Sequence, residues 1–128
     1  MKILLDTQIA IWWNTDSSRI SPEAKELISD ASIEKYVSHA SLWEMAVKIR
    51  IGKLKILPNL AAFVDKKIKN NGMKLLPIDE QAIYATQTLE LHHQDPFDRL
   101  IIAQALVETI PVITSDAIWK RYPIRVLP

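Results

Sequence analysis

The stretch HHQDPFDRLIIAQALVETIPVITSD (residues 92–116) contains the change of character that decides the fold. It begins with charged and turn-forming residues, continues with an almost uninterrupted apolar run, and ends with a short apolar segment and an acid. Asp95 followed by Pro96 is a typical helix start, because Asp caps free backbone N–H groups and proline fits the first helical turn. The PVIT segment that follows is short and apolar, as a buried strand is. A buried helix leading into a buried strand predicts an α/β fold.

The rest of the chain repeats this alternation. Short runs rich in Ile, Leu and Val alternate with longer stretches of helical period, and there is no internal repeat or linker-like segment. The predicted strands are Lys2–Leu5, Lys35–Val37, Met73–Leu76, Val112–Thr114 and Ile124–Leu127. The predicted helices start at Ser21, Ser38 or Ser41, Asn59, Asp79 and Asp95. Strands separated by helices imply right-handed crossovers, so we expect a mainly parallel sheet of about five strands, covered by helices on both faces.

The composition fits one domain over residues 1–128. A chain of 128 residues buries roughly 65–70% of its unfolded surface without cross-links. The absence of cysteine excludes disulfides and thiolate metal sites and favours a reducing compartment, so we expect a cytoplasmic protein. No apolar segment has the length of a membrane span or of a signal-peptide core, and no membrane partner is expected. With only two glycines, the chain lacks the Gly-rich loops that hold nucleotide phosphates.

Four acidic residues from distant segments are expected at one edge of the sheet. Asp6 ends the first predicted strand, and Asp116 follows the fourth by one serine. Glu44 and Asp98 fall in the first turns of two helices that follow loops at the same edge, where ligands of parallel sheets usually bind. Carboxylates held close together repel one another unless a cation is present. Mg²⁺ or Mn²⁺ would resolve that repulsion, and a water activated by the metal could then attack a phosphodiester.

Each of these acids also has a purely structural interpretation. The residues from Asp95 to Asp98 fit the positions N-cap to N3 of a helix, where an acid gains from the helix dipole. Ser41 and Glu44 have the spacing of a capping box, and Glu44 with Lys48 makes a favourable i,i+4 pair. Capping would also gather acids at this edge, because all the helix amino termini meet there. It does not account for the scarcity of basic residues beside the four acids in the sequence.

Other polar residues carry weaker signals. His92 and His93 lie beside Asp95, but no third nitrogen or sulfur ligand is near them in the sequence, so a polar loop that closes the preceding helix is favoured over a transition-metal site. A contact of either histidine with phosphate or a base stays open. The 16 basic and 15 acidic residues nearly cancel, so only local patches can indicate nucleic acid. One basic strip lies near the acidic edge and is a hypothetical phosphate contact: Lys48, Arg50, Lys53 and Lys55. A second lysine group is interpreted as an exposed helix end: Lys66, Lys67 and Lys69.

With these positions in view, the chain resembles the PIN-domain ribonucleases of the VapC type, the toxins of bacterial and archaeal type II toxin–antitoxin pairs. The resemblance spans essentially the whole length and rests on five motifs in order: LLDTQIAIWW, VSHASLWEMAVKIRIGKL, LLPI, HHQDPFDRLIIAQAL and VITSD. It implies a three-layer α/β/α sandwich and an Mg²⁺- or Mn²⁺-dependent endoribonuclease. It also implies RNA as the substrate, a cognate antitoxin as a partner, and a homodimer or a toxin–antitoxin hetero-oligomer.

The same resemblance assigns roles to individual residues. Asp6 and Asp98 correspond to direct metal ligands, and Glu44 and Asp116 to residues that bind the metal directly or through water, hold a second ion or orient the attacking water. Four neighbouring residues are expected to support the ligands or contact RNA: Asp95, Arg99, Thr114 and Ser115. Asp95 belongs to a DPFDR variant in which it is also the helix cap, so its chemical role stays open.

Two competing functions can be separated from the sequence. The haloacid-dehalogenase-like phosphatases also place an aspartate after the first strand, but they need a second one two residues later, where this chain has Gln8. The serious alternative is a catalytically silent PIN-fold module that binds RNA or a protein. The presence of all four acids argues against it, because a scaffold does not need them.

Overall fold

The computed structural model describes residues 1–128. Strand β1 (Lys2–Leu5) lies at the centre of its sheet. Its strand order is β3-β2-β1-β4-β5, and every neighbouring pair is parallel. β1 pairs with β2 over four residues and with β4 over two. The other strands are β2 (Glu34–Ser38), β3 (Met73–Leu76), β4 (Val112–Ile113) and β5 (Val126–Leu127). The expected mainly parallel sheet is therefore confirmed and is entirely parallel.

Helices connect all the strands except β4 and β5, which a short 3₁₀ helix joins. The α-helices are α1 (Thr7–Thr15), α2 (Pro22–Ser29), α3 (His39–Arg50), α4 (Leu60–Phe63), α5 (Glu80–Thr86) and α6 (Pro96–Glu108). The shorter helical turns are η1 (Ser17–Arg19), η2 (Val64–Ile68), η3 (Lys69–Asn71) and η4 (Ala117–Arg121). No helix has the length and apolar character needed to cross a membrane.

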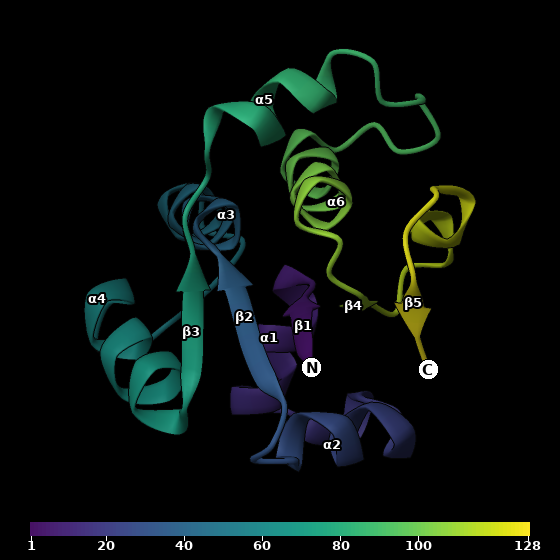
Figure 1. Cartoon of the computed structure of the whole chain (residues 1–128). Helices are drawn as coiled ribbons and strands as arrows, with labels where there is room; N and C mark the ends of the chain where they lie inside the picture. Colours follow the sequence, from purple (N-terminus) through teal and green to yellow (C-terminus); the bar gives the residue numbers. More distant parts are fainter.

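Alternate residues of β1 point into two separate cores. Ile3 and Leu5 pack with α1, α2 and the α4–η2 segment, whereas Leu4 packs with α6 and η4. Because successive side chains of a strand face opposite ways, this division places a layer of helices on each side of the sheet. The two apolar clusters confirm the three-layer α/β/α sandwich (Figure 1).

The predicted helix caps are largely confirmed. The side chains of Ser21, Ser38, Asn59 and Asp79 each accept a backbone N–H at the start of their helix. Asp95 accepts two, from Phe97 and Asp98.

The capping box at Ser41 and Glu44 was wrong. Ser38 is the cap of α3, which places Ser41 inside the helix. Ser41 is buried there and accepts a hydrogen bond from the Thr7 hydroxyl at 2.7 Å.

Two helices flank the carboxyl end of β1. The arrowheads of β1, β2 and β3 in Figure 1 point towards α3 and α6, and α2 lies at the opposite end of the sheet. α6 is fixed to this edge by Gln104, which accepts a hydrogen bond from Ser38 and donates one to the Pro77 carbonyl. Side chains in the first turns of α3 and α6 are therefore brought next to the residues that follow β1 and β4.

Candidate metal centre

Asp6 lies in the middle of this edge, directly after the central strand. It occupies the N-cap position of α1, yet its side chain makes no capping hydrogen bond. Its Oδ2 instead accepts a hydrogen bond from the Thr114 hydroxyl at 2.6 Å, which links the ends of β1 and β4. Burial, reinforced by the charge of Glu44, raises the pKa of Asp6 to about 6 despite the opposing Thr114 hydrogen bond. The side chain thus does not cap α1, and it lies close enough to Glu44 and Asp116 for their charges to act on it.

Glu44 is buried on the side of α3 that faces Asp6. Its Oε2 pairs with Lys48 at 2.7 Å, as the i,i+4 spacing predicted. Its Oε1 is buried without any hydrogen-bond partner. Buried polar atoms nearly always have a partner, because an unsatisfied one costs about 1–3 kcal/mol. A partnerless carboxylate oxygen among other carboxylates fits a bound cation.

Asp98 stands at the head of α6, one turn after the cap residue Asp95. Burial, together with the charges of Asp6 and Asp95, raises the pKa of Asp98 to about 7. One carboxylate oxygen from each of Glu44, Asp95 and Asp98 lies within 4.8 Å of the others. Oxygen ligands of this kind and number suit Mg²⁺ and Mn²⁺, so the side chains present fit the ion that the fold implies.

Asp116 combines a local role with a place in the cluster. Its Oδ1 accepts the backbone N–H of Ile118 and so caps η4, whereas its Oδ2 faces the cluster. The Thr114 hydroxyl accepts the Asp116 N–H at 3.0 Å while donating to Asp6, which joins the two acids. Ser115 is exposed and forms no side-chain hydrogen bond. The four predicted acids thus lie near one another with Asp95 and Thr114, but Ser115 does not join them. Asp6 interacts electrostatically with Glu44, Asp98 and Asp116, yet it belongs to neither group of acids whose ligand atoms lie within 4.8 Å of one another.

His93 is the residue of the cluster that the sequence did not indicate. Its Nε2 lies 2.7 Å from Asp98 Oδ2 and 2.8 Å from Asp116 Oδ2. The adjacent His92 points elsewhere, with its ring edge-on to Tyr122 at 5.1 Å between centroids. The sequence favoured a polar loop at these histidines. The structure instead groups His93 with Asp98 and Asp116, with one ligand atom of each within 4.8 Å of the others. Its position depends on the path of residues 87–94, which short-range patterns do not specify.

Arg99 holds residues 87–94 in place. Its guanidinium donates to four backbone carbonyls of the segment before α6, those of Thr86, Leu89, Glu90 and His93. These donors are therefore directed at the loop and hold the backbone that carries His93.

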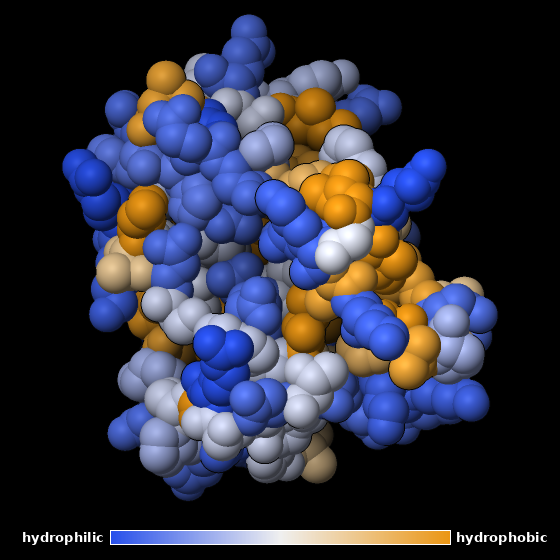
Figure 2. Space-filling view, turned by 180° about the vertical axis from the view of Figure 1, so that it is seen from behind, coloured by the Kyte–Doolittle hydropathy of each residue, from blue (hydrophilic) through white to orange (hydrophobic).

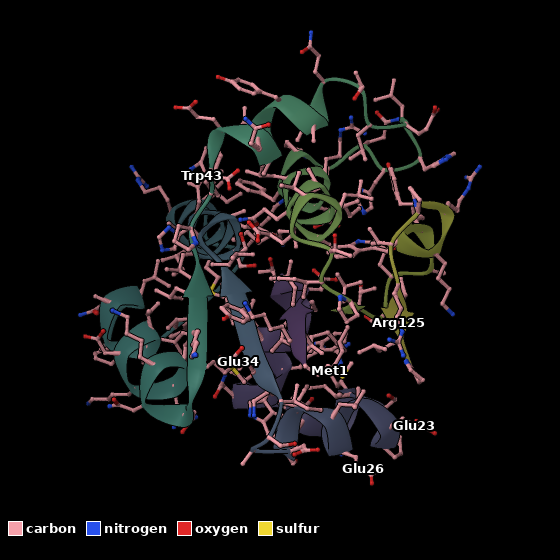
Figure 3. All side chains as sticks on the ribbon, viewed as in Figure 1. Met1, Glu23, Glu26, Glu34, Trp43 and Arg125 are labelled. Carbon is pink, nitrogen blue, oxygen red and sulfur yellow. The ribbon has the colours of Figure 1, made fainter.

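An aromatic pair borders the acidic cluster on the outside. Trp43, next to Glu44 in α3, is 59% exposed, and its ring meets Phe97 edge-on at 4.9 Å between centroids. Figure 3 shows Trp43 beyond α3, towards α5. A mostly apolar groove of about 640 Å³ lies there, lined by residues that include Trp43, Ile78, Leu91 and Leu100. Trp43 thus belongs to an apolar groove whose lining includes none of the clustered acids.

The fold and the site together define an α/β domain with a cluster of carboxylates at the carboxyl edge of a parallel sheet. The chain belongs to the PIN domain family, whose model matches residues 3–124. Comparison with curated proteins gives no significant match.

Solved structures of VapBC complexes share the fold. The DNA-bound VapBC of Salmonella typhimurium has a TM-score of 0.75 at 22% identity, covering 99% of this chain and 97% of that one. VapBC2 of Rickettsia felis, bound to a DNA fragment from its promoter, has a TM-score of 0.74 at 16% identity, with 99% and 98% covered. VapBC-5 of Mycobacterium tuberculosis, from a family of toxin–antitoxin systems, has a TM-score of 0.61 at 19% identity, with 98% and 97% covered.

Proposed function

We propose that this protein is a metal-dependent endoribonuclease that acts as the toxin of a toxin–antitoxin pair. The observation that carries the proposal is the buried, partnerless Oε1 of Glu44 in a pocket where the pKa of Asp98 is raised to about 7. Such a pocket is poorly suited to a folded protein alone, because ionised carboxylates in it repel one another. It is well suited to a protein that binds Mg²⁺ or Mn²⁺.

The clustered residues have different roles in the proposed metal site. Asp6, Glu44, Asp98 and Asp116 would supply the oxygen ligands, directly or through water. Thr114 orients Asp6 through its 2.6 Å hydrogen bond, and Lys48 orients Glu44 through the opposite oxygen. A bound divalent ion supplies a more acidic water and positive charge against the phosphate during hydrolysis. The side chains of the chain itself fix where that chemistry takes place.

A cognate antitoxin is the proposed protein partner. The related crystal structures contain VapBC complexes bound to DNA, and the FitAB complex bound to IR36 DNA has the same fold, with a TM-score of 0.65. In this chain, apolar surface is exposed in the segment between α3 and α4, where Ile51 is 59% and Leu57 is 74% exposed. Figure 2 shows apolar side chains gathered on one side of the rear face. Exposed apolar patches are typical of interfaces, so we propose a homodimer or a toxin–antitoxin hetero-oligomer.

The principal test is RNA cleavage by the purified chain freed from any antitoxin. With Mg²⁺ or Mn²⁺ present, we expect nicks in structured RNA that stop when EDTA is added. Asp6→Asn and Asp98→Asn each remove one ligand charge with almost no change in shape, and each should lower the rate by at least about 100-fold, or about 2.7 kcal/mol in the barrier. The measurement is the initial rate of appearance of labelled fragments.

Asp65→Asn is the matched control for this experiment. Asp65 is exposed and pairs only with Lys69 on η3, far from the cluster in the sequence. Its replacement should leave the rate unchanged. Equal cleavage by the wild type and by both active-site variants would indicate a contaminating nuclease. Absence of cleavage by the metal-loaded wild type would favour the alternative, a catalytically silent module that binds RNA or protein.

A further inference from the structure

His93 connects the carboxylates of two acids from distant segments, Asp98 and Asp116. A single ring nitrogen, Nε2, contacts both Asp98 Oδ2 at 2.7 Å and Asp116 Oδ2 at 2.8 Å. The His93 and Asp98 side chains are only 12% and 13% exposed. At these distances His93 replaces any ion or water that could otherwise lie between the two oxygens.

The other ring nitrogen determines what His93 can do. Nδ1 accepts the backbone N–H of Asp95 at 3.1 Å. An acceptor nitrogen carries a lone pair, so the ring hydrogen of neutral His93 is on Nε2 and points at the two carboxylates. In this arrangement Nε2 has no lone pair free for a metal, and His93 is a hydrogen-bond donor instead of a ligand.

The position of the ring is built into the fold. The His93 N–H donates to the Tyr122 hydroxyl at 2.7 Å, and the same hydroxyl donates to the Glu90 carbonyl at 2.7 Å. Arg99 holds the carbonyls of Glu90 and His93 from the other side. Hydrogen bonds thus hold both the N–H and the carbonyl of His93. The position of this residue therefore does not depend on a bound ion.

The acidic oxygens consequently fall into two sets. The first set belongs to Glu44, Asp95 and Asp98, and Glu44 also carries the buried Oε1 that has no partner. The second set belongs to Asp98 and Asp116, and His93 already lies within it. Within the first set, Lys48 donates to Glu44 Oε2 and two backbone N–H groups donate to Asp95 Oδ1, but Glu44 Oε1 has no donor.

We propose that His93 takes the place of a second cation, so that the pocket binds one divalent ion on its Glu44 side while His93 joins Asp98 to Asp116. This inference rests on the proposed metal site but not on RNA cleavage. His93 is then a positioning residue that orients two carboxylates.

The test is the number of Mn²⁺ ions bound per chain, measured from the free-ion signal in electron paramagnetic resonance. Wild type should bind one ion. His93→Gln keeps an N–H donor and should also bind one. His93→Ala removes the donor and opens the space between Asp98 and Asp116, so it should bind a second, weaker ion. His92→Ala is the matched control, because His92 makes no contact with the acids, and it should bind one.

Nitrogen coupling in the same samples gives an independent readout. A directly coordinated imidazole produces ¹⁴N modulation in the spin echo of bound Mn²⁺, and we expect none from wild type. Direct ¹⁴N coupling that disappears in His93→Gln would show that His93 is a ligand and would overturn the proposal. Two ions in wild type, or a single ion in a folded His93→Ala, would overturn it as well.

The outcomes also separate this inference from the proposed function. One Mn²⁺ without RNA cleavage would leave the role of His93 intact and count against the ribonuclease. No Mn²⁺ binding by wild type would overturn both the role of His93 and the proposed metal centre. If His93→Ala fails to fold, the ion count and the nitrogen coupling of wild type and His93→Gln still decide the question.

Discussion

Aspartates at helix starts behave in two different ways in this protein. One side-chain oxygen of Asp95 accepts hydrogen bonds from two backbone N–H groups, so Asp95 is a helix cap. Asp6 occupies the equivalent position of α1 but makes no capping bond, and its oxygen accepts from Thr114, 108 residues away in the sequence. Sequence position alone predicts either use, because both residues precede a helix. The difference arises from the neighbouring strand, which brings a hydroxyl to one acid and not to the other.

The acids could be predicted from the sequence, whereas His93 and the use of Arg99 could not. An acid after a buried strand or in the first turn of a helix marks the carboxyl edge of a parallel sheet. The contacts of His93 depend instead on how residues 87–94 fold back over α6. That path is set by Arg99 and Tyr122, whose partners are backbone carbonyls and an N–H group without any signature in the sequence.

Replacing Asp98 by Asn should stabilise the metal-free protein above neutral pH. The pKa of Asp98 is raised from 3.8 to about 7, so the folded state binds more protons than the unfolded state between these values. Its contribution to stability therefore falls as pH rises from about 4 to about 7 and stays low above that range. Without the charge, Asp98→Asn should gain on the order of 2 kcal/mol, or about 6 to 10 °C in melting temperature, in EDTA at about pH 8.

Asp98→Asn should also gain less stability from Mg²⁺ than the wild type does. Thermal unfolding with Mg²⁺ at 100 times its dissociation constant should raise the stability of wild type by about 2.7 kcal/mol, and that of Asp98→Asn by much less. The control Asp65→Asn should follow the wild type with and without Mg²⁺. A variant that is less stable than wild type in EDTA at about pH 8 would contradict the repulsion on which the metal centre depends.

At the scale of elements, α6 carries both the cap and part of the cluster. Asp95→Asn keeps a capping side chain and removes the charge, whereas Asp95→Ala removes both. We expect Asp95→Ala to lose about 1 kcal/mol of unfolding free energy in urea, and Asp95→Asn to lose little. Both should bind Mn²⁺ several-fold more weakly, because an Asp95 oxygen lies within 4.8 Å of oxygens from Glu44 and Asp98.

Asp79 provides the comparison for this pair of substitutions. It caps α5 through the N–H of Ala82, as Asp95 caps α6, but it is not among the clustered acids. Asp79→Ala should therefore reduce stability without changing Mn²⁺ affinity. Unaltered Mn²⁺ binding by Asp95→Asn would mean that Asp95 is a cap and nothing more.

The predicted strand bounds were right for some strands and wrong for others, and burial does not explain the difference, because β4 is fully buried and β3 is not. β1 and β3 have the predicted bounds, whereas β4 ends at Ile113 and β5 begins only at Val126. Thr114 is not part of β4, because its hydroxyl donates to Asp6 and accepts the Asp116 N–H. The start of β5 is delayed by the bend after η4, where Ile124 donates to the Tyr122 carbonyl. The apolar pattern of a strand does not predict such contacts with residues outside the strand.

At the scale of the whole molecule, the hypothetical phosphate contact is the basic segment that follows α3. Three exposed basic residues follow the part of α3 that carries Glu44: Arg50, Lys53 and Lys55. Replacing all three by Ala should weaken RNA binding at low salt and flatten its salt dependence, because each phosphate contact contributes about −0.7 to the slope of log affinity against log salt. Titration of labelled RNA at several salt concentrations, with an inactive Asp6→Asn background, measures both effects.

The lysines of η2 and η3 make a fair comparison. Lys66, Lys67 and Lys69 are exposed on η2 and η3 and carry the same charge. Their triple replacement should change the slope less than the replacement after α3. Equal effects of the two triple variants would indicate binding by overall charge and no defined RNA face.

The hydrogen bond between Thr114 and Asp6 has a consequence during protein synthesis. It spans 108 residues and closes only after β4 has aligned with β1. A nascent chain that has delivered Asp6, Glu44 and even Asp98 still lacks the strand that completes the pocket. The proposed metal centre is therefore complete only after residue 114 has been synthesised and β4 has paired with β1.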